Sequence, residues 1–195
     1  MRRWLPIALL LPLVLPLSAC GYNRIQSLDE NASRAQGQIE VQLQRRADLI
    51  PNLVATVKGY AQHENDVFTQ VAQARSGLVN AIQSKDPEQM ANANAQLSTS
   101  LGRLMVTVEA YPQLKANQNF MALQDELTGT ENRISVARTD YNQAVNDYNA
   151  YIRQFPQVLT ARMTGAKQRK YFTVTTPGAQ NAPTVDFSKP GATSK

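Results

Sequence analysis

An apolar stripe with the period of a helix runs through the first third of the chain. Between Ile25 and Ala61, apolar residues recur in ten steps of three or four over 36 residues, a mean spacing of 3.6. Positions spaced in this way share one side of an α-helix, so the stretch predicts a long amphipathic helix. Pro51 lies inside it, but the stripe keeps its phase on both sides. This favours a helix that continues through a kink over a new helix that starts at Pro51.

Three further helices are predicted downstream. An apolar face resumes between Val67 and Ile82, after Gly59 and the polar run 62–66 interrupt the pattern. Asp86-Pro87 begins the next helix, because it combines a capping side chain with a proline in the first turn. Its expected apolar face comprises Met90, Ala93, Leu97, Leu101, Leu104, Val108 and Tyr111. The last helix is expected from Asn117 to Phe155, with a mean repeat of 3.5 if Thr130 fills one place in its stripe.

These patterns predict an all-α protein, an up-and-down antiparallel bundle of about four long helices. A repeat slightly below 3.6 predicts a left-handed twist between long neighbours, and the short loops at 83–86 and 111–117 favour antiparallel packing. The bundle is expected to cover residues 20–172. The segment 173–195 is rich in Pro, Gly, Thr and Ala and is expected to form a flexible tail.

The first nineteen residues have the features of an export signal. Arg2 and Arg3 precede an almost wholly apolar run from Leu5 to Leu17, and the small residues Ser18 and Ala19 follow it. A membrane-spanning helix is the alternative. It needs about 20 apolar residues, whereas this run is shorter and contains three prolines, each without a backbone N–H. The pattern therefore favours a signal that is removed before Cys20.

The sequence Leu17-Ser18-Ala19-Cys20 resembles the bacterial lipobox, in which the new N-terminal cysteine carries fatty acyl chains such as palmitate. Cys20 is the single cysteine of the chain, so an internal disulfide is impossible. The resemblance implies a lipid-anchored protein of the cell envelope, and Gly21 after the cysteine favours the outer membrane, facing the periplasm. Loss of residues 1–19 lowers the formal net charge by two, from +5 to +3. A scattered charge of this size does not indicate nucleic-acid binding.

The residues of common catalytic and metal sites are not assembled in this sequence. His63 is the only histidine, so neither a di-iron cage nor a Ser-His-Asp triad has its usual parts, and a solvated loop is the simpler place for it. The glycines are too far apart for a phosphate-binding loop. Asp125, Glu126 and Glu131 are best interpreted as the solvated face of the last helix. We therefore expect no catalytic residue, no metal, no cofactor and no enzymatic activity.

Two charged clusters remain as candidate contact sites. Arg45, Arg46 and Asp48 form a candidate partner surface, although Arg45 and Asp48 have the i,i+3 spacing of an ordinary surface ion pair. Lys167, Arg169 and Lys170 follow the last long helix. An even number of helices would return them to the end that carries Cys20, so they are candidates for contact with anionic lipid headgroups.

Several long segments resemble the LemA family in order and spacing. They are VQLQRRADLIPNLVATVKGYAQHE at 41–64, EAYPQLKANQNF at 109–120, LQDELTGTENRISVARTDYNQAVNDYNAYIRQFP at 123–156 and APTVDF at 182–187. The resemblance implies a helical bundle on the outer side of a membrane, tied to it through the N-terminus. Many members have a membrane helix there, whereas Cys20 points to lipid. The family has no established enzymatic activity, members often neighbour TPM-domain proteins, and some relatives belong to magnetosome membranes.

The expected function is a non-catalytic scaffold or adaptor that binds an envelope protein, with a TPM-domain protein as one candidate, while acylated Cys20 holds it at the bilayer. One alternative is an envelope hydrolase that uses carboxylates from different helices. Another is a membrane-shaping protein, which the magnetosome relatives suggest. The sequence leaves the partner, the oligomeric state and the physiological process open.

Overall fold

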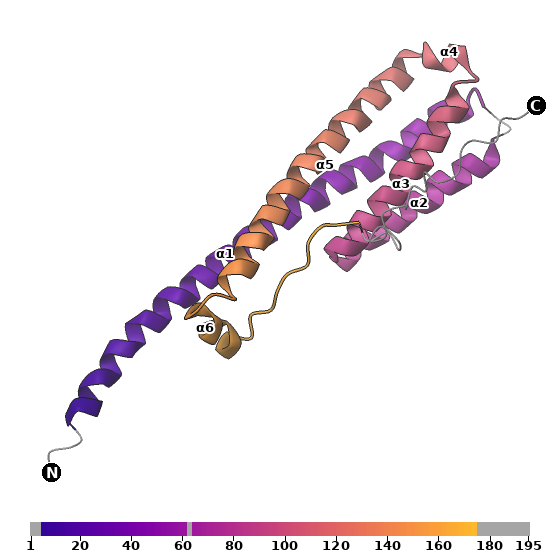
Figure 1. Ribbon diagram of the computed structural model, residues 1–195. Coiled ribbons are helices and arrows are strands. Elements are labelled where there is room, and N and C mark those ends of the chain that lie inside the picture. Colours follow the sequence, from indigo (N-terminus) through magenta and orange to yellow (C-terminus); the bar gives the residue numbers. More distant parts are fainter. Residues whose placement is uncertain (1–4, 62–63, 175–195) are drawn as a thin grey trace, which may run out of the picture.

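The computed structural model describes residues 5–61 and 64–174, with side chains from Gly21 onward. It contains six α-helices and no strand in these ranges. They are α1 (Leu5–Lys58), α2 (Asn65–Ser84), α3 (Pro87–Val108), α4 (Pro112–Lys115), α5 (Gln118–Tyr151) and α6 (Gln157–Thr164). The predicted all-α bundle is confirmed, with α1, α2, α3 and α5 as its four long helices (Figure 1). His63 lies outside the described residues.

The bundle has two unequal halves along its length. Helix α5 runs beside α1 along its whole length, and the N-terminal part of α1 projects beyond it. Helices α2 and α3 form an antiparallel hairpin against the half that ends at α4 (Figure 1). In the other half, α6 packs on α1, and an extended segment leads back from α6 toward the turn between α2 and α3. We call residues 165–174 the strap. Four helices are therefore side by side over only part of the molecule.

Helix α1 continues without a break through Pro51, so the alternative of a new helix at that residue is wrong. The boundary predicted near Gly59 is confirmed, because α1 ends at Lys58 and α2 begins at Asn65. Helical backbone extends back to Leu5, through the predicted signal. Within the described ranges, no helix combines the length and the hydropathy that a membrane crossing requires.

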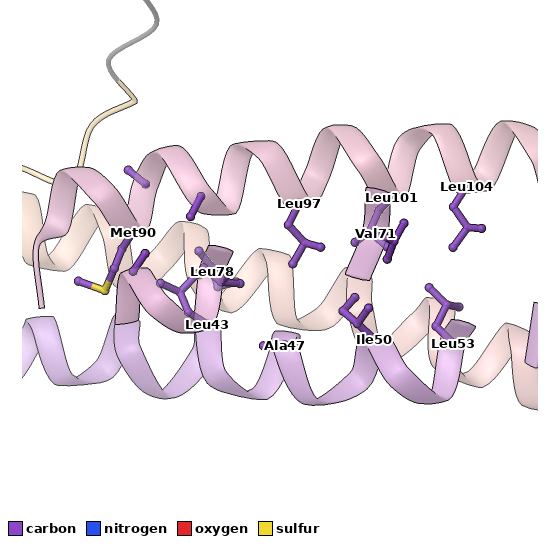
Figure 2. Packing of buried hydrophobic residues seen from close by; sticks show 14 of the residues in the cluster. Leu43, Ala47, Ile50, Leu53, Val71, Leu78, Met90, Leu97, Leu101 and Leu104 are labelled. Atoms are coloured by element: carbon purple, nitrogen blue, oxygen red, sulfur yellow. The ribbon is translucent and has the colours of Figure 1, made fainter. Parts of the chain in front are cut away.

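The predicted stripes form the core. Nine of the eleven residues of the stripe predicted between Ile25 and Ala61 are buried, and the other two, Ala35 and Val54, pack against the core. Figure 2 shows Leu97, Leu101 and Leu104 of α3 facing α1, where Ala47, Ile50 and Leu53 lie. Thr130 fills its place in the α5 stripe and is fully buried.

The ends of α3 and α5 follow from local chemistry. Asp86 caps α3 as predicted, and its carboxylate accepts hydrogen bonds from the backbone N–H of Glu88 and Gln89 at 2.9 and 3.3 Å. Asn117 caps α5 by accepting from the N–H of Phe120 at 3.1 Å. Helix α5 ends at Tyr151, four residues earlier than predicted. Pro156 disfavours helical backbone at the residue before it, and the chain turns over 152–156 into α6, which the sequence analysis did not predict.

Candidate protein-binding groove

Two asparagines of α5 hold the strap by its backbone. The side-chain amide of Asn149 donates to the carbonyl of Arg169 at 2.9 Å, and its oxygen accepts from the N–H of Arg169 at 2.8 Å. Asn142 makes the same pair of bonds with Phe172, at 3.2 and 2.8 Å. The hydroxyl of Tyr141 donates to the carbonyl of Lys170 at 2.8 Å. Side chains of α5 thus provide hydrogen bonds to the backbone of an extended segment that has no strand beside it.

The spacing of the two asparagines matches the strap. Asn142 and Asn149 are seven helical steps apart, a rise of about 10 Å, and the three extended steps from Arg169 to Phe172 also span about 10 Å. We call Asn142 and Asn149 the asparagine clamps, and the sequence analysis did not identify them. Their signal is that each asparagine directly follows a buried tyrosine of the α5 stripe, Tyr141 or Tyr148, and so lies at the edge of the core face.

Ion pairs fix the strap on its other side. Arg169 Nε donates to Asp29 at 2.7 Å, Arg169 Nη2 donates to Ser33 at 2.6 Å, and Lys170 Nζ lies 2.6 Å from a carboxylate oxygen of Asp86. The hydrogen bond from Lys170, aided by the two capping N–H groups, lowers the pKa of Asp86. The bond to Asp29 raises the pKa of the Arg169 guanidinium.

The positions of Arg169 and Lys170 correct the expectation that they lie beside Cys20. The chain does return to that end at α6, but the strap then carries it back along α5, and Lys170 reaches the turn between α2 and α3 (Figure 1). Lys167 is exposed at the start of the strap. Cys20 lies in the helical backbone of α1, and its side chain is outside the described part of the chain.

A groove separates α3 from α5 where the strap ends. Helix α3 packs closely on α2, and α5 packs closely on α1, but α3 and α5 have few direct contacts. The space between them is a groove of about 290 Å³. We call it the α3/α5 groove; its walls include Asn94, Ala95 and Ser98 from α3 and Glu131, Ser135 and Arg138 from α5. Phe172 and Val174 of the strap also line it, so an extended segment of the chain forms part of the boundary of this groove.

Arg46 of α1 bridges the two walls from below. Its guanidinium donates to the side-chain oxygen of Asn94 and, at 3.0 Å, to the hydroxyl of Ser98, and it pairs with Glu131. The Arg46 side chain is only 7% exposed. Burial lowers its pKa, and the nearby Glu131 carboxylate opposes that shift. Arg46 is thus a structural link between three helices and is not available on a surface patch.

The other two members of the predicted patch also have partners. Arg45 pairs with Glu126 of α5, not with Asp48 as the i,i+3 spacing suggested. Asp48 accepts from the side-chain amide of Gln44 at 2.8 Å. The partner surface predicted at Arg45, Arg46 and Asp48 is therefore divided between a buried network and two exposed polar contacts. The network of Arg46 lies at the groove, and this is the part of the prediction that the structure connects with a candidate binding site.

Two of the acids singled out from the sequence have arginine partners on α1. Glu126 pairs with Arg45, and Glu131 pairs with Arg46. The described part of the chain contains no group of three histidines, cysteines or acids placed to hold a metal ion. A shallower depression of about 460 Å³ lies on another face of α5, where Val136 and Asp140 line it with Ala35 and Gln38 of α1.

Comparison with known proteins gives a consistent assignment. The model of the LemA family matches residues 35–187. Magnetosome protein MamQ 2 of Paramagnetospirillum magneticum is 29% identical over 174 aligned residues, which cover 77% of this chain and 64% of the relative. MamQ of Magnetospirillum gryphiswaldense is 28% identical with the same coverage. Protein LemA of Metamycoplasma hominis is 24% identical over 134 residues, covering 68% of this chain and 60% of the relative.

The chain thus spans slightly less than two thirds of the length of these relatives. The family match includes the α1 residues at the groove floor, both groove walls and the strap, and it continues past the strap to Phe187. The match to the family model covers most of the sequence, and the chain belongs to the LemA family.

Proposed function

We propose that this protein is a non-catalytic scaffold of the cell envelope, held at a membrane by acylated Cys20, which binds an envelope protein in the α3/α5 groove. The lipobox-like sequence before Cys20 supports the anchor. The observation that carries the binding role is the strap, because it shows the surface of α5 holding an extended segment through backbone hydrogen bonds.

The residues of the groove indicate which kind of partner segment it can bind. The groove is narrow, its wall residues Ala95, Ser98 and Ser135 are small, and Asn94 and Glu131 are already bonded to Arg46. An extended segment with small or β-branched side chains fits this shape, as Val174 does. Among candidate partners, the family resemblance favours a TPM-domain protein. The MamQ relatives are named magnetosome proteins, which is consistent with a membrane location for this chain.

Site-specific photocrosslinking tests the binding role. A photoreactive amino acid is placed at Ser135, which lines the groove, and in a control at Val136, which is 62% exposed on another face of the same helix. We expect one reproducible crosslinked protein from Ser135 in the membrane fraction and none from Val136. Equal crosslinking at the two positions, or repeated absence of any product from Ser135, contradicts the proposal.

Mass spectrometry of the mature N-terminus tests the anchor. We expect cleavage before Cys20 and an acylated cysteine. A chain that keeps residues 1–19 with a free thiol refutes the anchor.

The alternative of a hydrolase has a separate test. It requires two carboxylates that face one substrate. Of the two α5 acids that pair with arginines, Glu131 lines the groove and Glu126 precedes it on the same helix. Their arginine partners support a structural role for both. We expect the purified wild type, Glu126→Gln and Glu131→Gln proteins to show the same absence of hydrolytic activity. An activity that the wild type has and both variants lose would establish the hydrolase instead.

A further inference from the structure

Apolar side chains are concentrated at the end of the molecule that carries the N-terminal anchor. Phe155 is 81% exposed, Leu159 is 52% exposed and Met163 is 88% exposed. We call these three residues the apolar patch. Leu159 and Met163 are four residues apart on α6 and therefore share one face of that helix. The other exposed large apolar residues of the four long helices, such as Val41, Val106 and Val136, are scattered singly over different faces, as is normal for a soluble surface.

Packing holds α6 in a fixed position at this end. Ala161 is buried against a small cluster with Ile25, Leu28, Tyr148 and Ile152. Gly165 ends the helix in a left-handed conformation, with φ at 71°. The buried side of α6 thus faces α1 and α5, which leaves Leu159 and Met163 on the outside. The apolar patch is not a loose end of the chain.

Helix α6 lies directly beside the residue that follows Cys20. A methyl group built on Gly21 would lie 3.8 Å from Thr160 Oγ1 and 4.0 Å from Gln157 Cγ. In Figure 1, α6 is at the end of the bundle opposite α4, on the side from which α1 leads to the N-terminus. Any anchor at Cys20 therefore holds the apolar patch close to the membrane surface.

The charge at this end fits an anionic membrane. From Tyr148 to Val174 the sequence has five basic residues and no acid. Arg169 and Lys170 are paired with Asp29 and Asp86, whereas three others are exposed around α6, namely Arg153, Arg162 and Lys167. On α1, the residues from Gly21 to Leu28 add Arg24 and no acid. Basic side chains next to exposed apolar ones are the composition of a segment that lies in the headgroup region.

We propose that the apolar patch enters the headgroup region of an anionic lipid bilayer, so that α6 sets the orientation of the bundle on the membrane. This inference rests on the proposed anchor at Cys20 and goes further. A lipid at the N-terminus limits the distance of the bundle from the membrane but does not fix the orientation of the bundle on it. The residues that contact lipid are then Phe155, Leu159 and Met163 with Arg153, Arg162 and Lys167. Of the cluster expected from the sequence, only Lys167 remains among them.

Tryptophan fluorescence tests this directly. The chain has one tryptophan, Trp4, within the predicted signal, so Trp4→Phe with Met163→Trp places a single reporter in the apolar patch. The matched control carries Val106→Trp in place of Met163→Trp, since Val106 is 74% exposed near the α4 end of α3. The full-length protein from the membrane fraction is reconstituted into vesicles of phosphatidylcholine and phosphatidylglycerol, with and without brominated acyl chains. Circular dichroism checks that both variants are folded.

We expect the emission of the reporter at position 163 to shift to shorter wavelength on vesicles and to be quenched by the brominated lipid, while the reporter at position 106 does neither. Exchange of Arg153, Arg162 and Lys167 for glutamine should reduce the quenching at position 163. Emission at position 163 that vesicles leave unchanged overturns the proposal. A shift that grows with protein concentration without vesicles also overturns it, because a second copy would then cover the patch.

Failure of the anchor has a different signature. It appears as an unprocessed N-terminus in the mass spectrum and as loss of flotation with vesicles. A protein that floats and is acylated, but whose reporter at position 163 is not quenched, refutes only the inference about α6.

Discussion

The asparagine clamps make a quantitative prediction for the strap. Asn149 is 3% exposed and makes two hydrogen bonds with the backbone of Arg169. A hydrogen bond of this kind contributes about 1 kcal/mol to stability. We therefore expect Asn149→Ala to lower the free energy of unfolding by about 2 kcal/mol. Asn142→Ala should cost less, about 1 kcal/mol, because Asn142 is only half-buried and its bond to the Phe172 carbonyl is longer, at 3.2 Å.

The two substitutions should not add. Once either clamp is lost, the segment from Arg169 to Phe172 can detach further, and the second clamp then has less to hold. The double variant should therefore cost less than the sum of the single variants, as neighbours that share a segment do. Buried Phe172 and the pair of Arg169 with Asp29 limit the total loss.

Urea titrations at neutral pH measure the free energies, and amide hydrogen exchange of residues 166–173 measures the opening of the strap. We expect faster exchange in this segment in both single variants while the core of α1 and α3 stays protected. The matched control is Asn132→Ala, because Asn132 is an exposed asparagine of the same helix and lies beside the shallow depression, away from the two clamps. An Asn149→Ala effect no larger than that of Asn132→Ala, or unchanged exchange in the strap, refutes the reasoning.

Three further predictions concern the core, a cap and a titrating group. Leu97→Ala should lower the free energy of unfolding by about 3 kcal/mol, because Leu97 is fully buried. The control Val106→Ala, at an exposed position of the same helix, should lower it by less than about 0.5 kcal/mol. Urea titration measures both values. Asp86→Ala should cost about 1 kcal/mol through loss of the α3 cap. Asp86→Asn keeps the cap but removes the ion pair. Because the pKa of Asp86 is lowered in the folded protein, the charged wild-type residue contributes stability that disappears as the pH falls through that pKa, whereas the variant has no such contribution. Urea titrations of both proteins at acidic and neutral pH measure the difference. Burial raises the pKa of Tyr141 to about 12, so the wild type should lose roughly 2 kcal/mol as the pH rises from about 10 to 12. Tyr141→Phe should flatten that part of the pH–stability curve measured by circular dichroism.

The elements that the sequence predicted well depend on local or periodic chemistry. The α1 stripe was predictable because burial on one side of a helix repeats every 3.6 residues, whatever the helix packs against. The cap at Asp86 was predictable because acceptor and donors lie within three residues of each other. Pro51 taken alone suggests a helix boundary, but the unchanged phase of the stripe on both sides of it already favoured one continuous helix.

The candidate groove could not be predicted in the same way. Its contacts join residues far apart in the chain, such as Arg46 with Asn94 and Arg169 with Asp29. Arg46 directly precedes Ala47 of the α1 stripe, and the sequence does not say whether such a flanking arginine faces solvent or a gap between two other helices. The answer depends on which helices are neighbours around the bundle. The strap was missed because it has neither helical nor strand periodicity.

The way the helices are connected explains why a groove exists between α3 and α5. Two residues join α2 to α3, so these helices must pack as a hairpin, whereas α4 and its flanking turns carry the chain across the end of the bundle and let α5 pack on α1. The seam between α3 and α5 then has few direct contacts. Arg46 reaches into it from α1 and binds both walls. Because Arg46 is remote from α6, a substitution that disturbs the groove should leave the proposed contact of α6 with the membrane unchanged.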